Sequence, residues 1–364
     1  MKKLKLLSVI GMFLAVPVLS ATNVFRMAKA GDMLWVTTNE GVSLCSLDGN
    51  QVVTYTLESL GLPENVSFYG VAVNGENDVW FGSTGNCVGH YDGDGFQLND
   101  APARMCRVVD VDTDGMLWVG ASERGLMSYD GSKWEIYEIE SISSSLFSQA
   151  VKADESDGLV WSVMSNGGGA GFGYHDSEGW HSVSLASEDF KQDTGDSFSS
   201  LEIAADGSKW LGLYHGQVCH FKNVDNYSII ELSKVARPEL YSSWAKDVQV
   251  GPDGRVWAAC LQSLYAIDCN YEVEEMEIPL AEGDGEITCF CHDGDAIWIG
   301  TSKGGLLRWS PLQLEHINIS AGFSEIAAPE AVDDVPTFDI MGRRVKCVTA
   351  GNLYIKAGHK FIIR

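Results

Sequence analysis

The chain has 364 residues, of which 45% are hydrophobic and 10% aromatic, so it has the apolar content of a folded core and not that of a disordered chain. Its 50 acidic residues outnumber 25 basic ones, giving a formal net charge of −25. The electrostatic field of this net negative charge repels phosphate groups, which argues against nucleic acid and anionic membrane surfaces as partners. A neutral glycan, a cation or a basic partner stays possible, and the charge also serves solubility alone.

The first 21 residues have the pattern of a secretory signal peptide. Three lysines near the start precede an apolar stretch over residues 6–19, and the small residues Ser20 and Ala21 follow. The stretch is too short to span a membrane, and no other segment approaches a run of about 18 apolar residues. Thr22 stands where a lipoprotein signal has its cysteine, so we expect no lipid anchor. We expect export and a soluble mature chain that begins near Thr22.

The nine cysteines are an odd number and contain no CxxC pair. Export permits disulfides, yet several cysteines stand where a strand would bury a small apolar side chain. Mostly free thiols and one or two disulfides are both compatible with this spacing.

One tryptophan-centred unit recurs seven times after the signal peptide. The tryptophans are separated by 38 to 49 residues, and most have apolar neighbours on both sides. A period of about 40 to 45 residues is typical of a four-stranded propeller blade. The sequence therefore predicts an all-β fold, a seven-bladed β-propeller over residues 22–319, with structural repeat positions at Trp35, Trp80, Trp118, Trp161, Trp210, Trp257 and Trp298.

Each unit repeats the same order of turns and strands. In four units an Asp-Gly pair, which favours a hairpin turn, precedes the tryptophan strand, and in four units a glycine follows the tryptophan. The positions before the tryptophan are Asp114, Asp157, Asp206 and Asp253, with Gly31 and Gly294 in the first and last units, and those after it are Gly82, Gly120, Gly212 and Gly300. We expect four consecutive strands per blade and a ring closed by packing between blades. The inner strands should begin near Asn23, Val66, Arg104, Gln149, Phe198, Trp244 and Glu286, and the last outer strand should end near Ile319.

Residues 118–126 (WVGASERGL) and 298–306 (WIGTSKGGL) resemble the two-component-regulator propeller repeat. The resemblance covers about residues 23 to 319, and the units at Trp161 and Trp257 match least because they lack the glycine after the tryptophan. It implies a periplasmic sensor propeller of the kind that is joined to a histidine kinase. Neither a membrane helix nor a kinase follows the propeller in this sequence, so we expect no membrane signalling by this chain alone.

The C-terminal segment differs in composition from the repeats. Residues 320–335 are rich in alanine and acidic residues, and Pro329 and Pro336 mark a linker. Residues 336–364 should form three short strands, at 337–345, 351–356 and 360–364, with a Met-Gly-Arg-Arg turn. This tail resembles the C-terminal sorting signal of the type IX secretion system of Bacteroidetes-type bacteria. The resemblance implies the export machinery as a partner and an extracellular or cell-surface location, with the periplasm as the alternative; a small β-appendage that packs on the propeller is the other interpretation of the tail.

One carboxylate-rich loop is a weak candidate for a metal site. Asp110, Asp112 and Asp114 alternate before a glycine, as at the opening of a calcium loop. The twelfth position is Ala121 where such a loop has glutamate, so a plain hairpin turn is the better interpretation. Calcium is thus a weak possibility, and we otherwise expect no cofactor and no metal.

The sequence contains no catalytic set that we can recognise. Residues 251–257 (GPDGRVW) resemble a repeat of the streptogramin lyases, but the phrase occurs once and the catalytic residues of that family have no match here. We therefore name no catalytic residue.

A ligand site is expected on the face that carries the loops after the tryptophan strands, because function concentrates in loops on a rigid scaffold. The candidate ligand-binding residues are Asn39, Glu40, Asn86, Glu123, Arg124, Asn166, His215, Gln262 and Lys303. The leading hypothesis is a secreted or cell-surface binding module for a glycan or protein ligand. A lyase or glycan-active enzyme on the same scaffold and a structural component of a surface complex are the alternatives.

Overall fold

The computed structural model describes residues 22–49, 52–122, 124–137, 147–165, 170–183, 198–233, 239–310, 313–317, 319, 337–339, 344–345, 353–356 and 359–362. The expected signal peptide (1–21) and the expected linker (320–335) lie outside these residues. The chain divides into two compact units, Met1–Ser320 and Ala321–Arg364. No helix in the described part of the chain is both long enough and apolar enough to cross a membrane.

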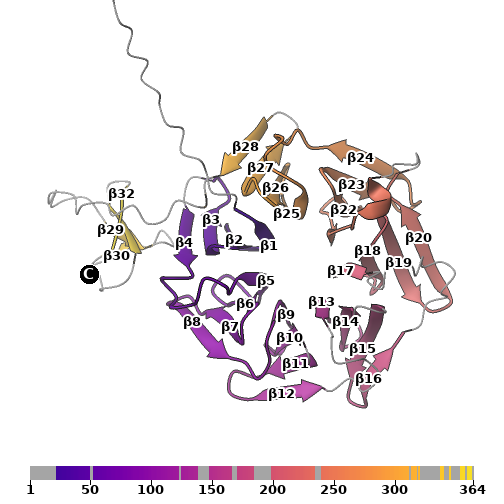
Figure 1. Cartoon of the computed structure of the whole chain (residues 1–364), viewed down its shortest axis with the longest axis horizontal. Coiled ribbons are helices and arrows are strands. Elements are labelled where there is room, and N and C mark those ends of the chain that lie inside the picture. Colours follow the sequence, from indigo (N-terminus) through magenta and orange to yellow (C-terminus); the bar gives the residue numbers. More distant parts are fainter. Residues whose placement is uncertain are drawn as a thin grey trace, which may run out of the picture. The chain divides into compact units, whose positions relative to one another are not determined.

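The first unit consists of seven four-stranded antiparallel sheets that form the blades of a propeller (Figure 1). Blade 1 contains β1 (Val24–Ala30), β2 (Met33–Thr38), β3 (Gly41–Ser46) and β4 (Val52–Thr56). Blade 2 contains β5 (Phe68–Val73), β6 (Val79–Ser83), β7 (Cys87–Tyr91) and β8 (Phe96–Asp100). Blade 3 contains β9 (Val108–Val111), β10 (Leu117–Ala121), β11 (Gly125–Tyr129) and β12 (Trp134–Tyr137).

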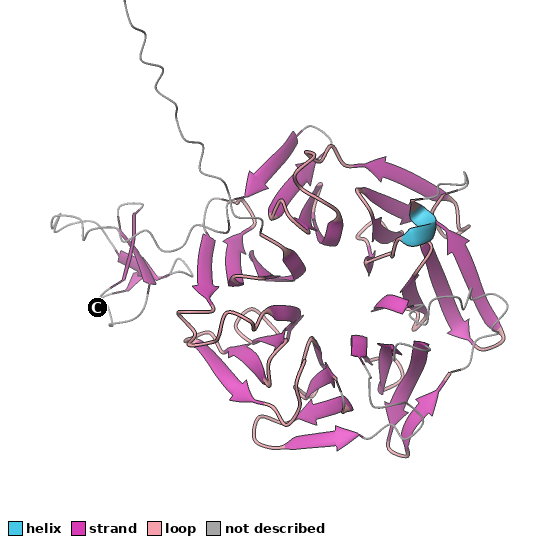
Figure 2. Cartoon of the chain, viewed as in Figure 1, coloured by secondary structure: helices cyan, strands magenta, loops and turns pink. Residues whose placement is uncertain are grey.

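The remaining four blades continue in chain order. Blade 4 contains β13 (Phe147–Asp154), β14 (Leu159–Ser165), β15 (Ala170–Asp176) and β16 (Gly179–Ser182). Blade 5 contains β17 (Phe198–Ile203), β18 (Lys209–Leu213), β19 (Gln217–Asn223) and β20 (Asn226–Glu231). Blade 6 contains β21 (Asp247–Val250), β22 (Val256–Cys260), β23 (Ser263–Ile267) and β24 (Val273–Glu277), and blade 7 contains β25 (Ile287–Asp293), β26 (Ala296–Thr301), β27 (Leu306–Ser310) and β28 (Gln313–Ile317). A short 3-10 helix, η2 (Leu240–Ser242), precedes blade 6 (Figure 2). The predicted all-β, seven-bladed propeller of four-stranded blades is confirmed.

The seven repeat tryptophans lie in the second strands and are all buried, between 0% and 9% exposed. Their rings contact the next blade along the chain. The Trp35 ring lies 5.2 Å from that of Phe81 in blade 2, and the Trp161 ring lies 6.1 Å from that of Phe221 in blade 5. Burial of large aromatic rings is the main free-energy gain available to such a sheet interface. The tryptophan repeat therefore builds the cores between blades.

The ring closes by packing between blades 7 and 1. Trp298 belongs to one buried cluster with Val24 and Leu34 of blade 1. Two hydrogen bonds support this cluster: the Thr54 hydroxyl donates to the carbonyl of Ile319 at 2.8 Å, and the Thr288 hydroxyl donates to the carbonyl of Val24 at 2.6 Å. Every blade sheet is made of four consecutive strands, as the sequence predicts.

The turns between the first and second strands follow the Asp-Gly pattern. Gly207 and Gly254 adopt φ of 78° and 76°, a region that only glycine enters without strain. The preceding carboxylates accept backbone N–H bonds from the same turns: Asp206 from Ser208 at 3.0 Å and Asp253 from Arg255 at 3.1 Å. Local sequence chemistry is thus enough to form these hairpins.

Four inner strands begin two to four residues away from the predicted starts, and β5 is one of them, since it begins at Phe68, two residues after Val66. Strand β9 begins at Val108, four residues after Arg104, because Met105 has φ of +55°, which an extended strand cannot accommodate. Strand β21 begins at Asp247, three residues after Trp244, since Trp244 forms an isolated bridge with Tyr214. Strand β13 begins two residues before Gln149. Each shift is within the usual uncertainty of strand ends.

The second unit contains one four-stranded sheet in the order β30-β29-β31-β32. Its strands are β29 (Thr337–Asp339), β30 (Arg344–Val345), β31 (Leu353–Lys356) and β32 (His359–Ile362), all paired antiparallel. The first predicted strand, residues 337–345, is in fact two strands that pair with each other. Most of the Met-Gly-Arg-Arg turn lies outside the described residues.

Eight of the nine cysteines lie in the described part of the chain, and all eight are free thiols. Six of them are buried, and Cys269 is exposed. Burial raises the pKa of Cys106 and Cys219 to about 12, which keeps these thiols protonated and unreactive. They act as small apolar side chains in the cores between blades.

Candidate functional site

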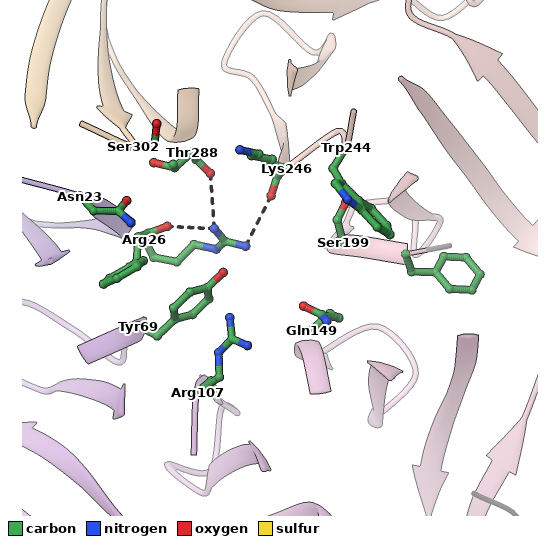
Figure 3. Close-up of a pocket in the computed structure, with 12 residues that line it drawn as sticks. Asn23, Arg26, Tyr69, Arg107, Gln149, Ser199, Trp244, Lys246, Thr288 and Ser302 are labelled. Atoms are coloured by element: carbon green, nitrogen blue, oxygen red, sulfur yellow. Dashed lines mark hydrogen bonds between the residues drawn. The ribbon is translucent and has the colours of Figure 1, made fainter. Parts of the chain in front are cut away.

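The first residues of the seven inner strands converge at one end of the central channel. Their side chains surround a cavity of about 450 Å³, here called the mouth. Every blade contributes to it, through Arg26, Tyr69, Arg107, Gln149, Ser199, Lys246 and Thr288, in order from blade 1 to blade 7 (Figure 3). Asn23, Phe25, Phe198, Trp244 and Ser302 complete the lining. This volume lies in the range of small-molecule sites.

The glycines after the tryptophans position the backbone at the mouth. A Cβ atom on Gly82 would lie 2.5 Å from the carbonyl oxygen of Arg107, and one on Gly212 would lie 2.2 Å from that of Ala245. Real side chains do not tolerate such distances, so glycine is needed for the next inner strand to approach this closely. The repeat glycine therefore sets the position of the backbone at Arg107 and at Ala245, the residue before Lys246.

Arg26 extends across the channel from blade 1. Its guanidinium donates to the carbonyl oxygens of Phe25 at 2.9 Å, Thr288 at 3.4 Å and Lys246 at 3.4 Å (Figure 3). All three acceptors are neutral, so these bonds orient the positive charge without cancelling it. Within the described residues, no carboxylate lies within salt-bridge distance of Arg26 or Arg107.

Tyr69 lies between the two arginines. The Arg107 guanidinium carbon is 4.1 Å from the centre of the Tyr69 ring, and that of Arg26 is 5.4 Å from it. Burial alone would raise the pKa of the phenol, but the charges of Arg26 and Arg107 and a hydrogen bond from Arg107 outweigh burial and lower the pKa below its ordinary value. The potential at the mouth is therefore positive.

The channel below the mouth carries charges of both signs. A cavity of about 300 Å³ is lined there by Lys152, Glu202 and Asp247, among others. The charges of Asp110 and Glu202 raise the pKa of Lys152, whose ammonium lies 3.6 Å from Glu202. Burial raises the pKa of Asp247 to about 6, against the lowering effect of Arg26. Opposite charges are thus balanced deeper in the channel and unbalanced at the mouth.

The predicted loop residues that the structure describes lie on the same face as the mouth. In each blade the second strand runs antiparallel to the inner strand and ends where the inner strand begins. The loops after the second strands and the first residues of the inner strands therefore share one face. Glu123 and Asn166 lie outside the described residues. The other seven, Asn39, Glu40, Asn86, Arg124, His215, Gln262 and Lys303, do not line the mouth.

Several predicted residues instead support loop structure. The Asn39 side-chain oxygen accepts the backbone N–H of Asn23 at 2.8 Å, and the Glu40 carboxylate accepts the Thr22 hydroxyl at 3.3 Å. Gln262 donates to the carbonyl of Gly285 at 3.0 Å, next to a separate acidic cavity lined by Glu275, Glu277 and Glu286. These contacts fix loops around the mouth and do not assemble one site.

The residues of the mouth were missed because they precede or begin the inner strands, outside the loops we considered. A signal for them exists in the repeat. Arg26, Tyr69, Arg107 and Lys246 stand 9, 11, 11 and 11 residues before their tryptophans. In units aligned on tryptophan, the position 11 residues earlier is polar in four units and apolar in three; it holds Tyr69, Arg107, Ser199 and Lys246, and Val24, Ala150 and Ile287.

The three aspartates of the weak calcium candidate have separate structural surroundings. The Asp112 carboxylate accepts the backbone N–H of Met116 at 2.9 Å and the indole N–H of Trp118 at 2.8 Å. Asp110 accepts the backbone N–H of Ala153 in blade 4 at 2.8 Å, and Asp114 is exposed. No trio of metal-ligating side chains occurs in the part of the chain that the structure describes.

The sequence matches no protein family's sequence model, and no curated protein matches it either. Its fold is similar to several solved structures. Virginiamycin B lyase from Staphylococcus aureus is 14% identical with a TM-score of 0.65, over 79% of this chain and 96% of that chain. The extracellular domain of a putative hybrid two component system from B. thetaiotaomicron is 16% identical with a TM-score of 0.60, over 93% of this chain and 44% of that chain.

A structure described as YCF48 bound to D1 peptide is 14% identical with a TM-score of 0.59, over 80% of this chain and 93% of that chain. The neighbours thus include a lyase, an extracellular domain of a two-component system and a propeller in complex with a peptide. Identities this low show the fold alone, because propellers of one architecture serve many functions.

Proposed function

We propose that this chain is an exported binding module that holds a glycan or protein ligand at the mouth of its central channel. The observation that carries the proposal is one cavity to which all seven blades contribute, with aromatic, amide and hydroxyl side chains around it. A rigid ring of blades keeps these groups in place before the ligand arrives, which lowers the entropic cost of binding.

The test is a calorimetric and thermal-shift screen of residues 22–364 against saccharides and peptides. Trp244→Ala removes a half-buried ring from the mouth and should weaken the binding of any ligand found. Trp180→Ala removes a half-buried ring from the outer strand β16 and serves as the matched control, with unchanged affinity expected. The absence of binding across a broad panel, or an equal loss of affinity in both variants, would count against a site at the mouth.

We further propose a propeller of the two-component-regulator type that is exported through its C-terminal tail. Two observations support this. The neighbour from B. thetaiotaomicron is described as an extracellular domain, and residues 321–364 form a compact unit with a sheet of their own. Deleting residues 336–364 should leave the propeller folded and retain it inside the cell; unchanged export would reject the role of the tail.

A second candidate function, a lyase, rests on Tyr69. A phenol with a lowered pKa beside two arginines suits removal of a proton from a substrate. Tyr69→Phe keeps the ring and removes the hydroxyl, so it should abolish turnover while it preserves binding. A search for products from each ligand identified in the screen, with metals supplied, decides between the two functions.

A further inference from the structure

Three cationic side chains lie at the mouth of an otherwise acidic protein. Arg26, Arg107 and Lys246 come from blades 1, 3 and 6, whereas the whole chain has a formal net charge of −25. Within the described residues, no carboxylate lines the mouth. Lys246 pairs with Glu286, which lies outside this lining. The local charge is thus opposite to the charge of the molecule.

The two guanidinium groups are oriented but not neutralised. Arg26 donates to carbonyl oxygens, and Arg107 stacks on Tyr69. The carboxylate of Asp247, below the mouth, acts on Arg26 from beyond salt-bridge distance, but among the described residues no carboxylate lies within that distance of either guanidinium. A partly buried charge without a close opposite charge lowers the stability of the fold. A ligand that brings a negative group would supply the missing partner, and a guanidinium fork binds a carboxylate with two parallel hydrogen bonds.

We propose that the mouth binds an acidic sugar, a hexuronic acid or a short saccharide that ends in one, with its carboxylate on the guanidinium of Arg107 and on the same side of the channel as the charge of Arg26. This proposal rests on the proposed binding function and names the ligand class for that same site. Lys246, whose ammonium is paired with Glu286, lies at the rim of the carboxylate position and can donate a further hydrogen bond. The repulsion between a uronate and the acidic outer surface acts at long range and is screened by salt, whereas the contacts at the mouth act at short range.

The rest of the lining favours a sugar over other anions. The hydroxyls of Ser199 and Thr288 donate to the carbonyls of Ala245 and Val24 and so present their oxygens as acceptors for sugar hydroxyls, and Gln149 adds an amide to the same lining. Trp244 and Tyr69 offer flat ring faces on which the C–H face of a pyranose can pack. An inorganic anion would use the cations alone, and the carboxylate at the end of a peptide lacks the row of hydroxyls.

The experiment is isothermal titration of residues 22–364 at neutral pH. The probes are glucuronate, galacturonate and digalacturonate, with galactose and galactobiose as neutral matches, sodium sulfate as a plain anion and acetyl-Gly-Ala as a peptide carboxylate. We expect the uronates to bind, digalacturonate most tightly, and the neutral sugars and sulfate to bind at least about tenfold more weakly, since the neutral sugars lose the charge-assisted fork and sulfate loses the hydroxyl and ring contacts of a sugar.

Variants then locate the binding. Arg107→Gln should weaken uronate binding about tenfold or more, and Arg107→Lys should lose less because the charge stays while the fork is lost. Arg255→Gln is the matched control: it removes the same charge from a turn between β21 and β22, where Arg255 pairs with Asp253 and Glu274, and it should leave the affinity unchanged. Arg26→Gln is a further test in which a loss of binding counts only if the thermal midpoint is retained.

Four outcomes would overturn the proposal, and they are distinguishable from failure of the binding function itself. Neutral sugars that bind as well as uronates, with Trp244→Ala abolishing both, would reject the anionic ligand and keep the binding module. Tighter binding of acetyl-Gly-Ala than of any uronate would replace the sugar by a peptide. Equal loss in Arg107→Gln and Arg255→Gln would show a general effect of charge. The absence of binding by every probe, together with a silent screen, would reject both proposals.

Discussion

The two ends of the central channel hold their charged side chains for different physical reasons. At the turn end, where the hairpins between first and second strands lie, carboxylates hold the local structure. Asp112 and Asp253 each accept the indole N–H of the tryptophan in their own blade, at 2.8 and 3.2 Å, besides N–H groups of their own turns. Hydrogen bonds from Ser208, from its hydroxyl and its backbone N–H, lower the pKa of Asp206 in the same way.

At the mouth, the arginines have no such local reason to be present. Arg26 and Arg107 complete no turn and no ion pair within the described residues, and the other blades contribute tyrosine, glutamine, serine, lysine and threonine to the mouth. Charges that recur with the repeat are therefore structural, whereas charges that differ between blades mark the individual function of this propeller.

The largest effect is expected from a side chain placed on a repeat glycine at the mouth. Gly82→Val would bring a Cβ within 2.5 Å of the carbonyl of Arg107, so blade 3 has to move. We expect the free energy of unfolding to fall by about 3 kcal/mol, as for overpacking of a tight core, and uronate binding to be lost. Urea denaturation and titration calorimetry measure the two effects.

The control is a glycine at the turn end. Gly254 has φ of 76°, and no neighbouring atom lies within 4 Å of an added Cβ. Gly254→Ala should therefore cost only the backbone strain, about 1 kcal/mol, with unchanged affinity. Equal loss of affinity in the two variants would contradict the separation of the two ends.

A smaller effect is expected from a carboxylate at the turn end. Asp112→Ala leaves the indole N–H of Trp118 and the N–H of Met116 without their acceptor, which should lower the free energy of unfolding by about 2 kcal/mol. Asp114→Ala, in the same turn, removes an exposed carboxylate and should change stability by less than about 0.5 kcal/mol. Neither variant should alter uronate affinity, and a loss of affinity in Asp112→Ala would show that the two ends are coupled.

The smallest effect concerns pH. Burial raises the pKa of Asp247 to about 6, although Arg26 lowers it; Glu202 raises it further, and Phe290 and Gln249 donate hydrogen bonds that lower it. The folded state therefore binds a proton more readily than the unfolded state, and its stability rises as the pH falls through 6. Between pH 7.5 and 5 this amounts to about 1 kcal/mol.

Asp247→Asn removes this titration, so from pH 7.5 to pH 5 the parent should gain about 1 kcal/mol in unfolding free energy relative to the variant. Urea denaturation at a series of pH values measures it. The turn carboxylates Asp206 and Asp253 respond in the opposite sense. Their pKa values are lowered in the folded state, so they stabilise the fold at neutral pH, and this stabilisation is lost as the pH falls below the pKa of a free aspartate. A difference that does not change with pH would show that Asp247 is not perturbed.

Much of the fold could be predicted from the sequence because its causes are local. The Asp-Gly pairs at Asp206 and Asp253 specify hairpins through their own hydrogen bonds and a positive φ. The spacing of the tryptophans specifies the number of blades, since one buried ring is needed at each interface. The start of β9 was misplaced because the positive φ of Met105 leaves no mark in residue type.

The candidate site depended on contacts that no single repeat contains. Sequence reasoning nominated loop residues that do not line the mouth, because Arg26, Tyr69 and Arg107 are at least 38 residues apart and become neighbours only when blades 1 to 3 stand side by side around the channel. The net charge of −25 even pointed away from an anionic ligand. The sequence by itself determined blades, turns and interfaces, which local hydrogen bonding and burial decide; only the tertiary structure decided which charges meet, since electrostatic potential at the mouth is set by distance in space and not by composition.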